Sequence, residues 1–116
     1  MRLETIEKQI QGIKQGLSQI GDMRPGSLSK QYNVCGVAGC RCKDPKSPKR
    51  HGPYYQLSYV HRGKSTSRFV RKKNVAEVKS QLAHYKRFRK LVDQWVRLAL
   101  ESAEIRLAQS RSEGSK

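Results

Sequence analysis

The sequence predicts an α+β protein with a helix near each end and a short β-hairpin between them. Three observations lead to this fold class. Apolar residues recur every three or four positions near the N-terminus, the helical period returns over the last third of the chain, and two runs rich in Tyr, Val, Thr and Phe lie between. With 116 residues, 35% of them hydrophobic, the chain suits one domain with a modest core and excludes a large catalytic fold.

The first predicted segment, residues 1–22, is an amphipathic helix that begins near residue 2 and ends near residue 20. Its apolar residues follow the alternating spacing of a coiled-coil seam: Leu3, Ile6, Ile10, Ile13, Leu17 and Ile20. Gly12 and Gly16 each weaken such a helix by about 1 kcal/mol relative to Ala. We therefore expect it to be ordered only when packed, on its own chain or on a second copy.

The second predicted segment, residues 23–73, is a basic module that contains a Cys-rich loop and a β-hairpin. Its strands are predicted over residues 54–60 and 66–70, joined by a connection over residues 61–65. Alternation places Tyr55, Leu57 and Tyr59 on one face of the first strand. Because an isolated hairpin is marginally stable, we expect one face of it to lie on a helix.

The third predicted segment, residues 74–109, is a long helix with Asn74 as its N-cap and Glu77 completing a capping box. Its apolar residues form two stripes, and together these stripes are wider than the surface that one packing partner would cover. We expect the N-terminal helix on one side, and the hairpin or the same helix of a second subunit on the other. The sequence therefore predicts coiled-coil packing and a homodimer, with a disordered tail over residues 110–116.

The charge of the chain is strongly positive and unevenly placed. Twenty-five Lys and Arg against nine Asp and Glu give a net charge of +16, and residues 24–92 hold 18 of the basic residues with only Asp44 and Glu77. A solvated surface normally mixes both signs. The asymmetry favours a polyanionic partner, and we expect nucleic acid, DNA in preference to RNA.

The predicted phosphate contacts belong to the loop, the hairpin and the residues that follow it: Lys43, Lys49, Arg50, Arg62, Lys64, Arg68, Arg71, Lys72 and Lys73. A further basic group lies on the exposed side of the long helix: Lys86, Arg87, Arg89 and Lys90. The alternatives are a charged hairpin exposed to solvent and, less favoured, an amphipathic helix on a membrane surface. Tyrosines of the strands are expected to pack in the core more often than to stack on bases.

Three cysteines and a histidine predict a zinc site. Cys35, Cys40, Cys42 and His51 lie within 17 residues and supply the thiolates and imidazole of a closed tetrahedral site, which would add folding energy to a small domain. His61 or His84 could replace His51 as the fourth ligand. The alternatives are three reduced thiols, or a redox switch favoured by the basic surroundings.

No catalytic constellation is predicted. The basic section has too few carboxylates for metal-dependent phosphoryl transfer, and Gly63-Lys64-Ser65 lacks the first glycine of a P-loop. A small strand-transfer enzyme with Tyr54 or Tyr55 as nucleophile is a remote alternative, and a protein adaptor or inhibitor that binds through its helices is a nearer one. No run of 18 apolar residues is present, so we expect no membrane association and a cytoplasmic location.

Several motifs together resemble a known family. The stretch from Met23 to Ser29, the C-x4-C-x-C cluster, the run His51-Gly52-Pro53-Tyr54-Tyr55 and the later Gly63-Lys64 are similar to an uncharacterised family of short basic bacterial proteins, a domain of unknown function followed by a long helix. The likeness spans about residues 23–105. It implies that the cysteines and His51 belong to one signature, which favours a structural metal, and an accessory role in a mobile element.

Overall fold

The chain folds into two compact units, each with its own hydrophobic core. The computed structural model describes residues 2–33, 39–44 and 51–114. Residues Arg24–Ala83 form one unit, here called the sheet unit, and Met1–Met23 with His84–Lys116 form the other, here called the helical unit. The long helix α2, Val75–Gly114, contributes its first turns to the sheet unit and the remainder to the helical unit.

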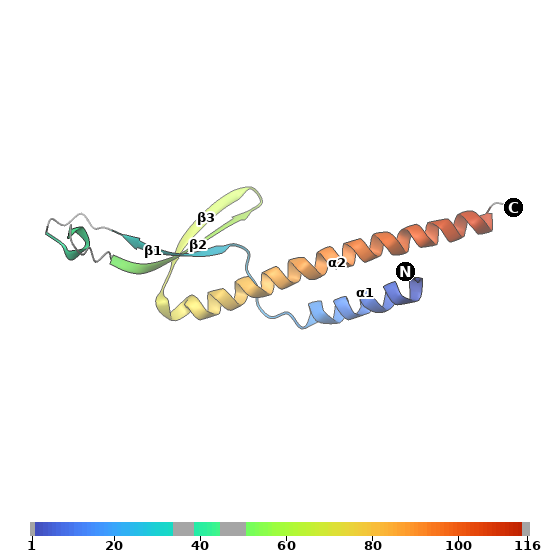
Figure 1. Ribbon diagram of the computed structural model, residues 1–116, viewed down its shortest axis with the longest axis horizontal. Coiled ribbons are helices and arrows are strands. Elements are labelled where there is room, and N and C mark those ends of the chain that lie inside the picture. Colours follow the sequence, from blue (N-terminus) through green and yellow to red (C-terminus); the bar gives the residue numbers. More distant parts are fainter. Residues whose placement is uncertain (1, 34–38, 45–50, 115–116) are drawn as a thin grey trace. The chain divides into compact units, whose positions relative to one another are not determined.

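The sheet unit contains three antiparallel strands in the order β1-β2-β3 (Figure 1). Strand β1 is Ser27–Asn33, β2 is His51–His61 and β3 is Lys64–Val70. A 3-10 turn, η1, covers Arg41–Lys43 between the first two strands, and a second one, η2, covers Lys72–Asn74 before α2.

The two faces of this sheet carry different side chains, because successive side chains along each strand point to opposite faces. Leu57 at the centre of β2 is 1% exposed and packs with Val78 and Leu82 from the first turns of α2. Leu28, Tyr59 and Val70 complete this cluster from all three strands. The helix therefore covers the face of the sheet that holds Leu57, as expected for a small sheet that needs a packed partner.

Gly26 allows the chain to pass close to the backbone of β2 just before β1 begins. Its φ is +124°, and a Cβ there would lie 2.5 Å from the Ser58 carbonyl oxygen. Only glycine adopts this conformation and permits this approach without strain. The next residue, Ser27, pairs directly with Ser58.

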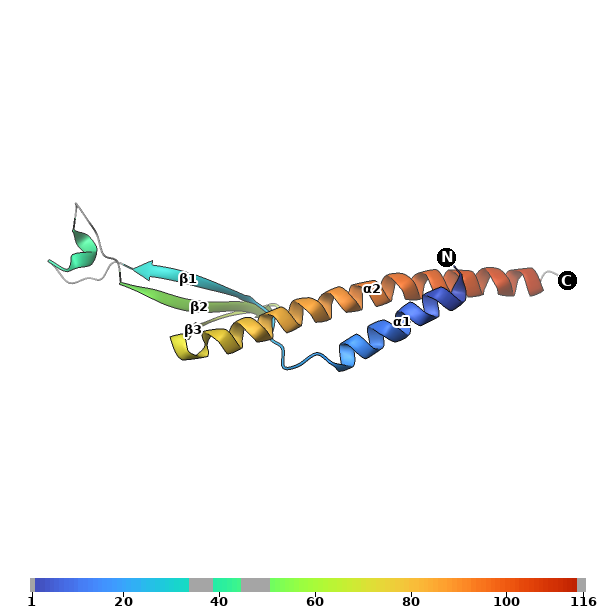
Figure 2. The same cartoon turned by 60° about the horizontal axis from the view of Figure 1, so that its bottom comes forward.

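The helical unit is an antiparallel pair of helices. Helix α1, Leu3–Ser18, lies alongside the C-terminal part of α2 in both views of the chain (Figures 1 and 2). Its seam residues Ile6 and Ile13 are buried with Leu98 of α2, and Trp95 packs against them. The 3-4 spacing of the N-terminal apolar residues thus correctly predicted a helix with one buried side, which here packs on α2 of the same chain.

The structure corrects the sequence prediction at three places. The sheet has three strands instead of two, because Ser27–Asn33 adds as β1 to the far side of β2. The connection of the hairpin is a two-residue turn, Arg62-Gly63, instead of residues 61–65. Helix α2 continues to Gly114, past the expected end at residue 109, so residues 110–114 are helical and no disordered tail begins there.

Candidate nucleic-acid interface

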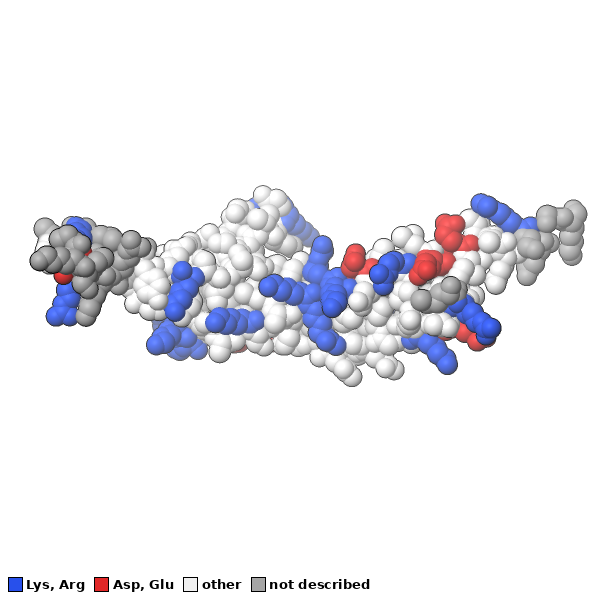
Figure 3. Space-filling model, viewed as in Figure 1, with Lys and Arg blue, Asp and Glu red and all other residues white. Residues whose placement is uncertain are grey.

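The positive charge is concentrated in the sheet unit. Residues 24–83 contain fourteen Lys and Arg against Asp44 and Glu77, a net charge of +12, whereas the helical unit has a net charge of +4. Figure 3 shows Lys and Arg along the N-terminal half of α2 and most of the visible Asp and Glu toward its C-terminal half. The imbalance that the sequence predicts for its middle section therefore belongs mainly to one folded unit.

The tip of the hairpin is a two-stranded ribbon. Strand β1 pairs with β2 only as far as Ser58, whereas β3 continues the pairing to His61 opposite Lys64. Arg62 and Gly63 form the turn with φ of +51° and +76°, the conformation that a two-residue type I′ turn requires. The exposed side chains of Arg62 and Lys64 thus lie on a ribbon of the width that a DNA major groove admits.

Arg68 lies apart from this tip. It pairs with Leu57 and is exposed at the edge strand β3, where it lines two adjoining grooves of the sheet unit. Arg24 lines both grooves as well, and Arg71 lines the second. These three arginines therefore line one stretch of surface together with Glu77, and the excess of positive charge there suits an anion.

Arg24 is a site residue that sequence reasoning did not single out. Its backbone N–H donates to the Gln81 carbonyl at 3.2 Å, and this hydrogen bond holds the segment before β1 against α2. Its side-chain Nε is buried without a hydrogen-bond partner. The sequence analysis places it in the Met23–Ser29 motif of the family resemblance but not among the phosphate contacts, because its position depends on a contact with a residue 57 positions later in the chain.

The other predicted phosphate contacts occupy two further places. Arg71, Lys72 and Lys73 are exposed at the junction between β3 and α2, where the Asn74 N–H donates to the Arg71 carbonyl at 2.8 Å. Lys43 is exposed in η1, in the segment between β1 and β2. Lys49 and Arg50 lie outside the described residues.

The predicted zinc site falls mostly outside the described part of the chain. Cys35 is not described, and of Cys42 and His51 only the backbone is, in η1 and at the start of β2. The register places His51 opposite Asn33, and the three cysteines lie between these two residues in the sequence. Among the described residues, no three His, Cys, Asp or Glu come together as a metal site, and zinc binding stays a prediction.

The two alternative histidines have separate surroundings. His61 lies at the hairpin tip, opposite Lys64. His84 belongs to the helical unit, where its Nδ1 lies 2.6 Å from the Asp22 carbonyl oxygen. That contact fixes the ring against the segment after α1.

The tyrosines divide between core and surface. Tyr59 packs in the core of the sheet unit, whereas Tyr32 and Tyr54 are 49% and 41% exposed. Tyr54 and Tyr55, the two candidate nucleophiles of a strand-transfer enzyme, point to opposite faces of β2 because they are consecutive strand residues. Only Tyr54 lies on the face away from α2.

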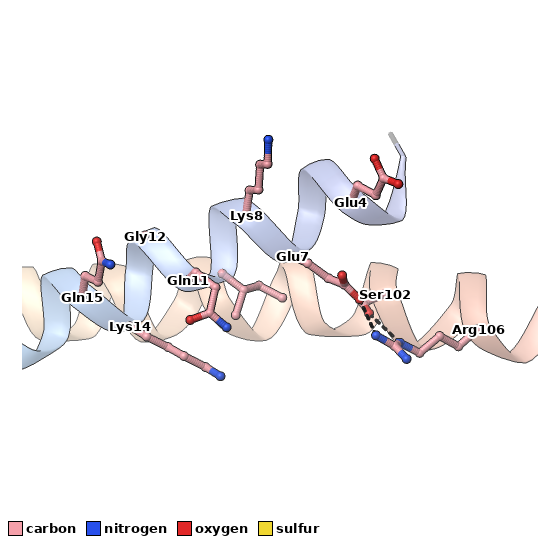
Figure 4. A pocket seen from close by; sticks show the side chains of 10 residues that line it. Glu4, Glu7, Lys8, Gln11, Gly12, Lys14, Gln15, Ser102 and Arg106 are labelled. Carbon is pink, nitrogen blue, oxygen red and sulfur yellow. Dashed lines mark hydrogen bonds and ion pairs between the residues drawn. The ribbon is translucent and has the colours of Figure 1, made fainter.

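The main groove of the helical unit has mixed charge. Glu4, Glu7, Lys8 and Lys14 line it along α1, and Glu7 forms an ion pair with Arg106 of α2 (Figure 4). Lys14 Nζ lies 5.2 Å from the centre of the Trp95 ring. This groove lacks the single-sign charge that a polyanion would require.

Within residues 2–33, 39–44 and 51–114, no helix is both long enough and apolar enough to cross a bilayer.

Comparison with known proteins places the chain in a family. No curated protein matches it, and no solved structure does. A family model, described as Domain of unknown function (DUF6788), matches residues 3–80, which include α1, the sheet and the first turns of α2. The match begins nearer the N-terminus and ends earlier than the resemblance in the sequence indicates. Because it covers more than half of the chain, the protein belongs to this DUF6788 family, in agreement with its expected membership of a family of unknown function.

Proposed function

We propose that the protein binds nucleic acid, with a preference for duplex DNA, and that the basic side chains of the sheet unit contact the phosphates. The observation that carries this proposal is the hairpin tip, where Arg62 and Lys64 project on a two-stranded ribbon beyond the end of β1. A ribbon of this kind enters the major groove, and its cations reach the phosphates at the groove edges.

The remaining charge supports the same function. The sheet unit has a net charge of +12, and its cations occur at the tip, in the grooves beside Arg24 and Arg68, and at the junction before α2. Several separate phosphate contacts make the affinity depend strongly on salt. For a duplex, each contacted phosphate steepens the slope of log K against log salt by about 0.9. Such binding is compatible with the predicted role as an accessory factor of a mobile element.

A binding series tests the proposal directly. The full chain is titrated into labelled duplex DNA, single-stranded DNA and RNA of matched sequence at two salt concentrations, and complex formation is followed by electrophoretic shift. We expect duplex binding that weakens steeply with salt. Absence of binding to every probe at low salt would contradict the proposal.

The helical unit supports a second candidate function, a protein adaptor or homodimer. Three large apolar residues of α2, here called the outer stripe, are more than two-fifths exposed: Val96 at 53%, Leu100 at 62% and Leu107 at 48%. Their spacing of four and seven residues places them on one side of the helix. Capture of a partner that survives high salt and nuclease treatment favours this candidate over nucleic-acid binding.

A further inference from the structure

The sheet face away from α2 is uncharged, although it belongs to the most basic unit of the protein. Alternate residues of β2, with their partners in β1 and β3, make up this surface, here called the open face. Its members are Ser27, Ser29, Gln31, Tyr54, Gln56, Ser58, Val60, Ser65, Ser67 and Phe69. Side-chain contacts from Gln31 to Gln56 and from Ser58 to Ser67 confirm that these residues share one face.

Aromatic rings flank a pair of amides at the centre of the open face. Phe69 is the direct cross-strand neighbour of Gln56 and is 76% exposed, and Tyr54, two positions before Gln56, is 41% exposed. Gln31 Nε2 donates to Gln56 Oε1 at 3.0 Å and to Ser29 Oγ at 3.3 Å. Among the described residues, none bonds to the side-chain N–H groups of Gln56 or to Gln31 Oε1, so these groups keep their capacity to bind a ligand.

We propose that the open face binds unpaired bases of a nucleic-acid strand, which stack on Phe69 and Tyr54 and exchange hydrogen bonds with the Gln31–Gln56 amides. Every base has a π-face that stacks on an exposed aromatic ring, and its edge carries the donors and acceptors that amides match. This inference rests on the proposed function, since phosphates of the same ligand engage the basic residues. It adds a second kind of contact, made to bases.

The rim of the open face has the cations that such a strand needs. Arg62 occupies the turn at one end of β3, and Arg71 follows its other end. The seven residues of β3 separate these positions by roughly 24 Å along the strand. Positive charge is thus available to phosphates at both ends of the open face, whereas the centre of this face has no charged side chain.

A duplex does not fit the open face. Three paired strands span roughly 10 Å between the outer backbones, and the side chains at both edges make the sheet wider than the major groove, which is about 12 Å wide. Bases in a duplex also present only their edges, so Phe69 and Tyr54 have nothing to stack on. The narrower hairpin tip and the open face therefore recognise paired and unpaired nucleic acid separately.

The face is also unsuited to a second protein sheet. Seven of its ten residues are Ser or Gln, and only Tyr54, Val60 and Phe69 provide apolar area. A covering protein sheet would bury these hydroxyls and amides, which costs free energy for each group that loses its hydrogen bond to water. Bases bring hydrogen-bonding groups of their own to such a surface.

Variants of exposed residues test the proposal without disturbing the core. The full chain is titrated by fluorescence anisotropy into labelled oligothymidine of about 20 nucleotides, longer than the segment that one such surface covers, and into a duplex of similar length. Phe69→Ala with Tyr54→Ala is the test variant. Val60→Ala is the matched control, because Val60 is apolar and 65% exposed on the same face but does not stack.

We expect the double variant to bind oligothymidine about tenfold or more weakly, with an unchanged salt slope and unchanged duplex affinity. Val60→Ala stays at the wild-type affinity, and Phe69→Trp with Tyr54→Ala binds oligothymidine more tightly than the double alanine variant. Crosslinking of an iodouracil-substituted oligonucleotide to the peptides that contain Phe69 or Tyr54 gives a readout independent of affinity.

Other outcomes overturn the inference in distinguishable ways. If oligothymidine binds equally well to the wild type and the double variant, the open face is not the base site, and the proposed function stands. If Phe69→Ala abolishes self-association in sedimentation and leaves oligothymidine binding intact, the occupant is a second copy. If neither probe binds the wild type at low salt, both the proposed function and this inference fail.

Discussion

Leu57 and Arg68 are direct partners across β2 and β3, yet Leu57 is 1% exposed and Arg68 is exposed beside Arg24. The two side chains leave the same face of the sheet. Leu57 lies on the central strand under α2, whereas Arg68 lies on the edge strand, where the sheet ends and solvent begins. The basic residues of the hairpin therefore form two groups, one at the tip and one in the grooves.

This separation predicts independent contributions to DNA binding. Arg62→Asn with Lys64→Gln removes two cations from the tip and keeps the turn, because Asn tolerates positive φ. We expect the magnitude of the salt slope for duplex DNA to fall by up to about 1.8, since each lost phosphate contact contributes about 0.9. Adding Arg68→Gln lowers it further by up to about 0.9. Fluorescence anisotropy across a salt series gives the slopes.

The control for these variants is Lys8→Gln with Arg97→Gln, which removes the same charge from exposed positions of the helical unit. Its slope should remain close to that of the wild type. A slope that changes equally in the control and in the tip variant would show that total charge, and not the hairpin, determines binding.

Burial of Leu57 predicts a large effect on stability. Leu57→Ala leaves a cavity between β2 and the first turns of α2, and we expect the free energy of unfolding to fall by about 2–5 kcal/mol. Val60→Ala, at a residue of the same strand that is 65% exposed, is the matched control and should change it by less than about 0.5 kcal/mol. Urea denaturation followed by circular dichroism measures both.

Packing in the helical unit is expected to depend on its apolar seam more than on its ion pair. Ile6 is fully buried, so Ile6→Ala should destabilise the unit by about 2–5 kcal/mol. Glu7 and Arg106 are 47% and 61% exposed, so Glu7→Gln should cost below about 1 kcal/mol, less at high salt. Thermal unfolding at low and high salt checks this ranking, and equal losses would contradict it.

The helices were predictable from sequence because their stabilising contacts follow a local period. Ile6 and Ile13 are spaced so that a helix places them on one side, and that side is buried. In β2, alternation correctly separated Leu57 from Val60, which is 65% exposed. Each of these inferences depends on neighbouring residues alone.

Strand β1 was missed because it has almost no strand composition. Of its seven residues, only Leu28 and Tyr32 are large and apolar or aromatic, and none is β-branched. It is held by backbone pairing to β2, with Leu28 opposite Leu57. The open face and the position of Arg24 were missed for the same reason, since both depend on pairing between distant segments.

The zinc prediction is tested by metal content and by substitution. Because structural zinc contributes folding free energy, we expect about one equivalent of zinc per purified chain and a loss of thermal stability on chelation. Cys40→Ser should abolish both effects, whereas His84→Gln should leave zinc content unaltered if His51 is the fourth ligand, because His84 Nδ1 is engaged with the Asp22 carbonyl oxygen. Less than about half an equivalent of zinc, with reduced thiols, would refute the site.

The outer stripe predicts self-association through α2. Val96, Leu100 and Leu107 face away from the residues that hold α1, because Leu98 and Trp95 occupy the opposite side of the helix. Leu100→Glu should therefore convert a dimer to a monomer in sedimentation equilibrium without loss of helical circular dichroism, since a charge at a paired apolar position opposes association. Lys79→Glu, which introduces an acidic residue at an exposed position of the same helix before the stripe, should leave the dimer intact. A wild-type chain that stays monomeric over the whole concentration range would contradict this prediction.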